Sequence, residues 1–149
     1  MQIKHRGAVE GVTGSCHELC IEGATPHSIL IDCGLFQGKD APHSRDKHDA
    51  LQIDFDIHPI QAVVLTHVHI DHVGRLPYLL SAGYKGPIIA SKASAKLLPM
   101  VLEDALKVGF TRDKDVIEQF LSVVDRQLVG IEPNQWYPIS PQSTIRLQR

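Results

Sequence analysis

The most constraining feature of the sequence is a histidine-rich motif that directly follows a short apolar run. Residues 62–65 (AVVL) are continuously apolar, which is typical of a strand buried on both faces of a sheet. Residues 67–72 then read H-x-H-x-D-H and supply three imidazoles and one carboxylate. This order predicts an α/β fold with the motif at the carboxyl end of a strand, where such sheets place their ligand sites.

The candidate metal ligands of this motif are His67, His69, Asp71 and His72. Imidazole and carboxylate both suit a divalent metal with the borderline softness of zinc. The even spacing of His67, His69 and Asp71, broken by His72, favours two metal positions. Two zinc ions roughly 3.5–4 Å apart can share a hydroxide that attacks a phosphodiester or an acyl bond. Two ligands for each metal are fewer than the usual three, however, and a chance cluster in a chain with nine histidines is the alternative.

Length and composition limit the classes of protein to consider. A chain of 149 residues has room for one domain, and its net charge of -2 comes without the basic block of a dedicated nucleic-acid arm. The first residues lack the apolar core of a signal peptide, and no apolar stretch approaches the ~20 residues that cross a bilayer. We therefore expect a cytoplasmic protein with no membrane contact, and the sequence leaves room for a homo-oligomer.

Three cysteines, Cys16, Cys20 and Cys33, fit a reducing compartment, because the number is odd and the chain is large enough to fold without disulfides. A structural zinc site that uses Cys16, His17 and Cys20 is conceivable. The four-ligand spacings of zinc fingers are missing, so we favour buried apolar thiols.

The remaining pattern alternates strands and helices. We predict strands at residues 2–5, 15–22, 28–32, 62–65, 88–90, 136–139 and 143–148. We predict helices over residues 76–80, 91–108 and 116–129. The first three strands are separated by glycine turns and are hairpin-like, whereas the order strand, helix, strand around residue 80 implies a crossover connection. The polar stretch 37–49 is predicted to be an exposed loop, with His43 and His48 solvated.

Four segments resemble the metallo-β-lactamase superfamily and, within it, the β-CASP nucleases that process RNA. They are residues 12–17 (VTGSCH), 31–38 (IDCGLFQG), 65–77 (LTHVHIDHVGRLP) and 86–90 (GPIIA). The likeness spans almost the whole chain and is closest to the members related to the nuclease subunit of the cleavage and polyadenylation machinery. It implies an αββα sandwich, of which this chain supplies the amino-terminal half with one mixed sheet and flanking helices.

The resemblance also implies ligand roles. His67 and His69 would bind the first zinc, and Asp71 and His72 the second, with Asp71 also counted as the catalytic residue. Family members carry further His and Asp ligands and the β-CASP insertion later in the chain. The strand-like end of this sequence favours continuation beyond Arg149.

Asp32 matches the carboxylate that supports the metal-binding residues from behind. The residues themselves favour this role, because a carboxylate that accepts hydrogen bonds from ligand imidazoles fixes their tautomer and orientation. The alternative is that Asp32 only caps the turn before Gly34. Gly14, Gly34 and Gly74 are predicted to form tight turns beside the site.

These observations and the resemblance predict a zinc-dependent hydrolase, with RNA as the substrate of the full-length protein and two zinc ions at its centre. Residues 1–149 alone are expected to have negligible turnover. One alternative is a thioester or lactone hydrolase of the same superfamily. Another is a non-enzymatic protein that keeps the half-site as a zinc binder.

Overall fold

The computed structural model describes residues 1–38, 51–109 and 111–148 and has an α/β fold with two sheets. The strands of the larger sheet are β1 (Gln2–His5), β2 (His17–Ile21), β3 (His27–Ile31), β4 (Ile60–Val64), β5 (Ile88–Ser91) and β6 (Leu128–Ile131). The smaller sheet is a hairpin of β7 (Trp136–Ser140) and β8 (Ser143–Arg146). The helices are α1 (Ile70–Val73), α2 (Leu76–Ser81), α3 (Lys92–Gly109) and α4 (Lys114–Gln127).

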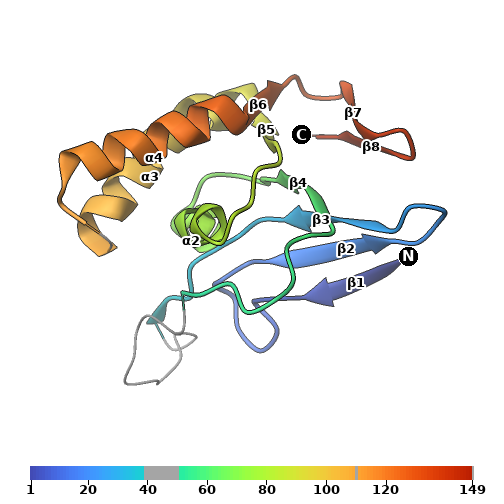
Figure 1. Cartoon of the computed structure of the whole chain (residues 1–149), viewed down its shortest axis with the longest axis horizontal. Coiled ribbons are helices and arrows are strands. Elements are labelled where there is room, and N and C mark those ends of the chain that lie inside the picture. The colour runs from blue at the N-terminus through green and yellow to red at the C-terminus, as the bar shows by residue number, and fades with distance from the viewer. Residues whose placement is uncertain (39–50, 110, 149) are drawn as a thin grey trace.

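The larger sheet is mixed and follows the order of the chain, from β1 to β6 (Figure 1). Strands β1, β2 and β3 pair antiparallel, as expected for the hairpin-like first third. The pairs β3–β4, β4–β5 and β5–β6 are parallel, as the crossover connection requires. The predicted α/β class, with one mixed sheet and flanking helices, is therefore confirmed.

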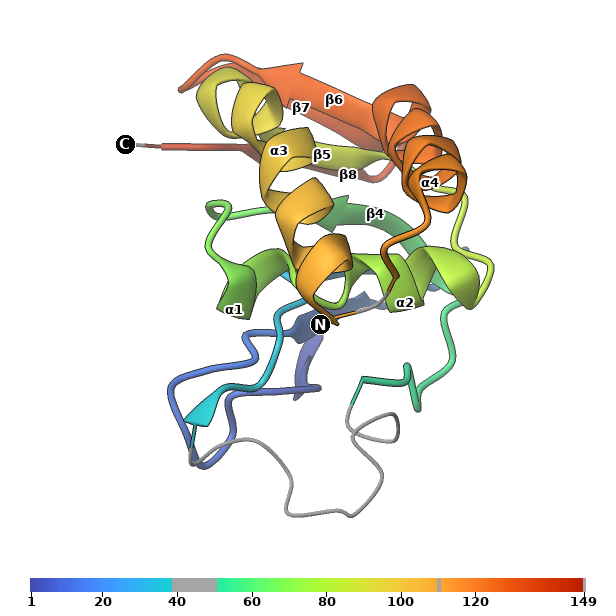
Figure 2. The ribbon, with the colours of Figure 1, turned by 90° about the vertical axis from the view of Figure 1, so that its left-hand side faces the viewer.

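The two faces of this sheet are covered by different elements. Residues on β4 alternate between them, because successive side chains of a strand point to opposite faces. Val63 packs in the main core with α2, α3 and α4, whereas Ala62 packs with residues of the β7–β8 hairpin. Figure 2 shows α1, α2, α3 and α4 together on one side. The continuous apolar run at residues 62–65 is explained by this coverage of both faces.

The apolar stripes and the N-terminal caps of α3 and α4 explain why these residues form helices. On α3, the buried residues Leu98, Leu102 and Leu106 recur every four positions and therefore lie on one face. The Ser91 hydroxyl accepts a hydrogen bond from the Ser94 N–H (3.1 Å) at the start of this helix. The Asp113 carboxylate caps α4 in the same way.

Two elements differ from the sequence-based expectation. The helix predicted over residues 116–129 ends at Gln127, and residues 128–131 form β6 beside β5. Leu128 continues the apolar stripe of the helix, so periodicity could not mark the change. Residues 70–73, expected in a loop, form the one-turn helix α1. Most of the predicted polar loop, with His43 and His48, lies outside the described residues.

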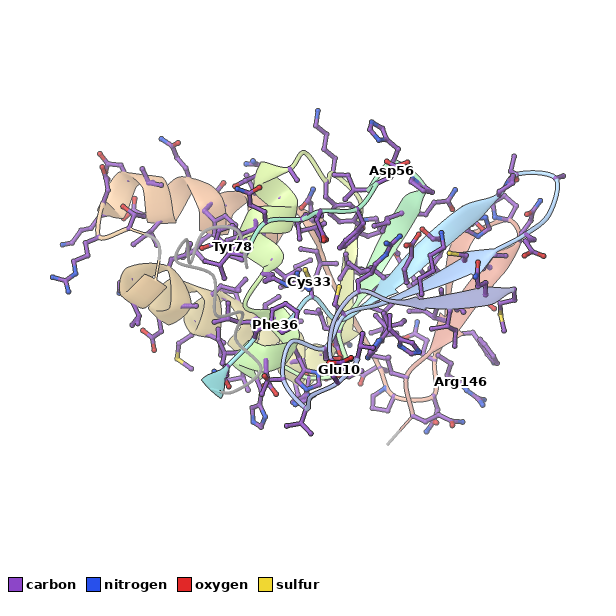
Figure 3. The ribbon with its side chains drawn as sticks, turned by 90° about the horizontal axis from the view of Figure 1, so that it is seen from below. Glu10, Cys33, Phe36, Asp56, Tyr78 and Arg146 are labelled. Carbon is purple, nitrogen blue, oxygen red and sulfur yellow. The ribbon has the colours of Figure 1, made fainter. Side chains whose placement is uncertain are left out.

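The prediction of buried thiols holds for two of the three cysteines. Cys16 and Cys33 are fully buried, and Cys20 is half-buried. Figure 3 shows Cys33 in the interior of the molecule, whereas Arg146 lies at its periphery. Among the helices of the described ranges, none combines the length and the apolar character needed to span a bilayer.

Candidate metal centre

Residues 67–72, called the ligand motif below, begin at the carboxyl end of β4. Strand β4 ends at Val64, and the second half of the motif is helix α1. Asp32 directly follows β3, the parallel neighbour of β4. Because the carboxyl ends of parallel strands meet at one edge of a sheet, Asp32 and the ligand motif are brought together although 35 positions separate Asp32 from His67.

Asp32 is the centre of a buried hydrogen-bond network. Its side chain is 2% exposed. Oδ2 lies 2.7 Å from Nδ1 of His72 and accepts a hydrogen bond from the Ser15 hydroxyl (3.1 Å). Oδ1 accepts from the backbone N–H of Thr66 (2.8 Å). An ionised carboxylate only accepts hydrogen bonds, so Nδ1 of His72 carries a proton and the neutral ring keeps its lone pair on Nε2. This is the geometry that a supporting role for Asp32 needs.

Thr66 extends the same network to His67, a role that the sequence did not indicate. The Thr66 hydroxyl lies 2.8 Å from Oδ2 of Asp32 and 3.0 Å from Nδ1 of His67. The hydroxyl has one proton, which it donates to the carboxylate, so its oxygen accepts from Nδ1–H of His67. The lone pair of His67 is then on Nε2. The only signal in the sequence is a hydroxyl residue directly before the first histidine.

The ligand atoms of the motif form two pairs. Nε2 of His67 lies 3.2 Å from Nδ1 of His69, and Nε2 of His72 lies 3.7 Å from Oδ2 of Asp71. Two nitrogens on one tetrahedral zinc are roughly 3.3 Å apart when each Zn–N bond is about 2.0–2.1 Å. The rings of His67 and His72 are adjacent, with centroids 3.9 Å apart. The donor set therefore fits two neighbouring metal positions with two protein ligands each.

Each pair is short of the three protein ligands of a usual catalytic zinc. Within residues 1–38, 51–109 and 111–148, no group of three or more His, Cys, Asp or Glu side chains could hold a metal ion. The same finding gives no support to the zinc site considered for Cys16, His17 and Cys20. The four ligand roles and the catalytic role of Asp71 remain predictions.

The protonation of His67 favours metal binding. Its partial burial lowers the pKa of the imidazole, and the neighbouring rings of His72 and His69 lower this pKa further. A neutral imidazole is the form that binds a metal. The lowered pKa of His67 therefore favours its neutral, metal-binding form at pH 7.

The three predicted turn glycines lie where other groups approach the backbone closely. A Cβ on Gly34 would overlap the carbonyl oxygen of Asp71, and one on Gly74 would lie 2.6 Å from the carbonyl oxygen of Ile70. Gly14 has a φ of +79°, and a Cβ there would overlap the ring of Phe36. Through Gly34 and Gly74, the segment after β3 and helix α1 can pack backbone to backbone.

Comparison with known proteins connects this arrangement to RNA-processing relatives. Ribonuclease TTHA0252 of Thermus thermophilus is 46% identical over 108 residues, which are 72% of this chain and 23% of the relative. Cleavage and polyadenylation specificity factor subunit 3-II of Arabidopsis thaliana is 39% identical over 110 residues, which are 71% of this chain and 17% of the relative. The chain thus spans less than a quarter of the length of either relative.

Among solved structures, the dizinc quorum-quenching lactonase AidC is 20% identical, with a TM-score of 0.45 over 81% of this chain and 44% of that protein. The profile of the metallo-β-lactamase superfamily matches residues 22–143, a range that contains Asp32 and the whole ligand motif. Since this match covers most of the sequence, the chain belongs to the metallo-β-lactamase superfamily.

Proposed function

We propose that this chain is the metal-binding part of a β-CASP ribonuclease that hydrolyses RNA phosphodiesters with two zinc ions. The two ligand pairs at the carboxyl end of β4, with one imidazole of each pair oriented through the Asp32 network, are the observation that carries the proposal. The names of the two RNA-processing relatives support RNA as the substrate. The third ligand of each metal and the β-CASP insertion would come from residues beyond Arg149.

Bound zinc would supply a nucleophile at neutral pH and would neutralise charge that develops on the phosphoryl oxygens. His67 and His69 would hold one ion, and Asp71 and His72 the other. Asp32 holds the proton of His72 on Nδ1, which directs Nε2 toward Asp71. Thr66 holds the proton of His67 on Nδ1, which directs Nε2 toward His69. The chain's own contribution is therefore to orient one imidazole of each ligand pair, His67 and His72, before the metal arrives.

Two variants of the complete protein test this function. His69→Ala should lower zinc-dependent cleavage of an RNA oligonucleotide at least about 100-fold, because one metal would keep a single ligand from this chain. His58→Ala is the matched control, since His58 is an exposed histidine whose ion pair with Asp56 lies outside the ligand motif. Equal cleavage by both variants, or cleavage that survives complete removal of metal, would refute the proposal.

The isolated chain provides a second test. Residues 1–149 alone should show negligible RNA turnover, because each metal would have only two protein ligands. Metal-dependent cleavage by this polypeptide above a His67→Ala control would show that the ligands beyond Arg149 are not needed.

A further inference from the structure

A cavity of about 710 Å³ adjoins the ligand motif on the side of α3. Its lining includes Thr66, which directly precedes the motif, together with Lys92, Lys96 and Glu132, and it reaches Leu147 and Gln148 at the end of the described chain. These residues follow three neighbouring parallel strands: Thr66 comes after β4, Lys92 after β5 and Glu132 after β6. The carboxyl ends of such strands meet at one edge of the sheet, about 4.7–4.9 Å from strand to strand. The cavity is therefore a lateral extension of the candidate metal centre.

The cavity has a net positive charge. Nζ of Lys92 lies 2.7 Å from Oε1 of Glu132, so these two charges largely cancel. Lys96 is one helical turn further along α3 and faces the same side, because residues four apart on a helix are neighbours. In the described part of the chain, no carboxylate forms an ion pair with Lys96. Its ammonium group is thus the charge available to a ligand in this cavity.

We infer that Lys96 binds a backbone phosphate of the RNA strand beside the scissile bond, an inference that rests on the proposed ribonuclease function. Each nucleotide carries one negative charge, and an ammonium group donates up to three hydrogen bonds to phosphate oxygens. A strand with its scissile phosphate at the ligand motif would place a neighbouring nucleotide in this cavity. Lys92, which forms an ion pair with Glu132, lines the cavity beside Lys96. The cavity supplies the cationic RNA contact that the overall charge of -2 does not suggest.

Binding measurements on the complete protein test this inference separately from cleavage. The probe is a fluorescent single-stranded RNA oligonucleotide, with EDTA present so that no turnover occurs. Lys96→Gln should weaken binding about fivefold at low salt. It should also make the slope of log K against log salt concentration shallower by about 0.7, the value expected for one lost phosphate contact on a single strand. Lys96→Arg should keep both values near those of the wild type.

Lys114→Gln is the matched control. Lys114 begins α4 just after α3 ends, and the 18 residues of α3 place the two ends of that helix about 27 Å apart. This control should bind RNA like the wild type. Equal affinities and equal salt slopes for Lys96→Gln and Lys114→Gln would overturn the inference, as would a lack of RNA binding by the wild-type protein.

A parallel cleavage assay with zinc separates the two proposals. If the protein cleaves RNA while Lys96→Gln binds like the control, the ribonuclease function stands and the phosphate contact is wrong. If RNA binding depends on Lys96 but no zinc-dependent cleavage occurs, the phosphate contact stands and the ribonuclease function is wrong.

Discussion

At the scale of single residues, Asp32 fixes which ring nitrogen carries the proton in two of the candidate ligands. Its carboxylate receives hydrogen bonds from His72, Thr66 and Ser15, and Thr66 passes the effect on to His67. Asp32 itself has a φ of 59°, a left-handed conformation that Asp and Asn tolerate better than most residues. One buried side chain thus sets the tautomers of two histidines that are expected to bind different metals.

Asp32→Asn should therefore lower zinc affinity 10- to 100-fold, about the usual effect of removing a carboxylate that supports a metal ligand. The amide tolerates the left-handed backbone, but it cannot accept all the hydrogen bonds of the carboxylate. Competition with a chelating dye would measure the affinity. Asp56→Asn is the control, because Asp56 is 68% exposed and contacts His58 outside the site. Equal zinc affinities in the two variants would contradict the role of Asp32.

The ion pair of Arg6 and Glu18 should make stability depend on pH. Burial opposes ionisation of Glu18, but hydrogen bonds from Arg6 at 2.7 and 3.0 Å prevail and lower the pKa of this carboxyl. Because the folded pKa lies below the unfolded value of about 4.3, the stabilisation is present above about pH 5 and is lost as pH falls through the folded pKa.

Glu18→Gln should lower the free energy of unfolding at pH 7 by about 2–3 kcal/mol, less than for a fully buried pair because Arg6 is 28% exposed. The difference from wild type should shrink as pH falls below about 5 and through the lowered pKa of Glu18. Urea unfolding at several pH values would measure it. A gap that stays constant over this range would show that the charge of Glu18 is not responsible.

The functional role of a residue is easier to predict from the sequence when it depends on neighbouring positions in the chain. The ligand motif is contiguous, so its composition alone indicates metal binding. The role of Thr66 depends on the end of β3 lying beside the end of β4, a long-range contact that the order of residues does not reveal. The sequence alone therefore does not predict the role of Thr66.

At the scale of elements, the close approach of α1 to the segment after β3 requires glycine. The N–H of Cys33 donates to the carbonyl of His72 (2.8 Å), and the N–H of Leu35 donates to the carbonyl of Ile70 (3.1 Å). Gly34 lies between these two hydrogen bonds, where a Cβ would overlap the backbone of Asp71. The ligand motif is held by these backbone contacts and by the side chain of Asp32, both from the segment after β3.

Gly34→Ala should destabilise the protein by about 3 kcal/mol or more, because neither backbone can move without breaking hydrogen bonds. Gly109→Ala is the control, since a Cβ at the end of α3 would meet nothing within 4 Å. This control should lie within about 1 kcal/mol of the wild type. Urea unfolding compares the two, and similar midpoints would refute the packing argument.

The boundary between α4 and β6 could not be predicted from the local pattern of apolar residues. Val124 and Leu128 are four residues apart, which extends the helical stripe, yet Leu128 pairs with Ile88 of β5. The parallel pairing of β6 with β5 overrides the helical pattern at this point, because it completes the sheet and covers Ile131. A strand that directly follows a helix, with no glycine or proline between them, gives no signal in the sequence.

At the scale of the whole molecule, the mixed sheet places the candidate site at one edge and the two apolar clusters on its faces. The α/β class and most elements could be predicted, because the continuous apolar run of β4 and the apolar stripes of α2 and α3 are clear. The arrangement of the site could not, because it depends on which strands are neighbours. Folding of the sheet and formation of the ligand pairs are therefore coupled, and metal binding should stabilise the whole fold.

Zinc should consequently raise the melting temperature of the domain. A ligand at 100 times its Kd that binds only the folded state stabilises it by about 2.7 kcal/mol, or about 5–10 °C for a domain of this size. The double variant His67→Ala, His69→Ala should lose much of this shift, whereas His58→Ala should keep it, because the His58 side chain is 94% exposed and lies outside the motif. Differential scanning fluorimetry with zinc and with EDTA would measure both. An equal zinc shift in the double variant would mean that the metal binds elsewhere, since these two imidazoles form one of the two ligand pairs.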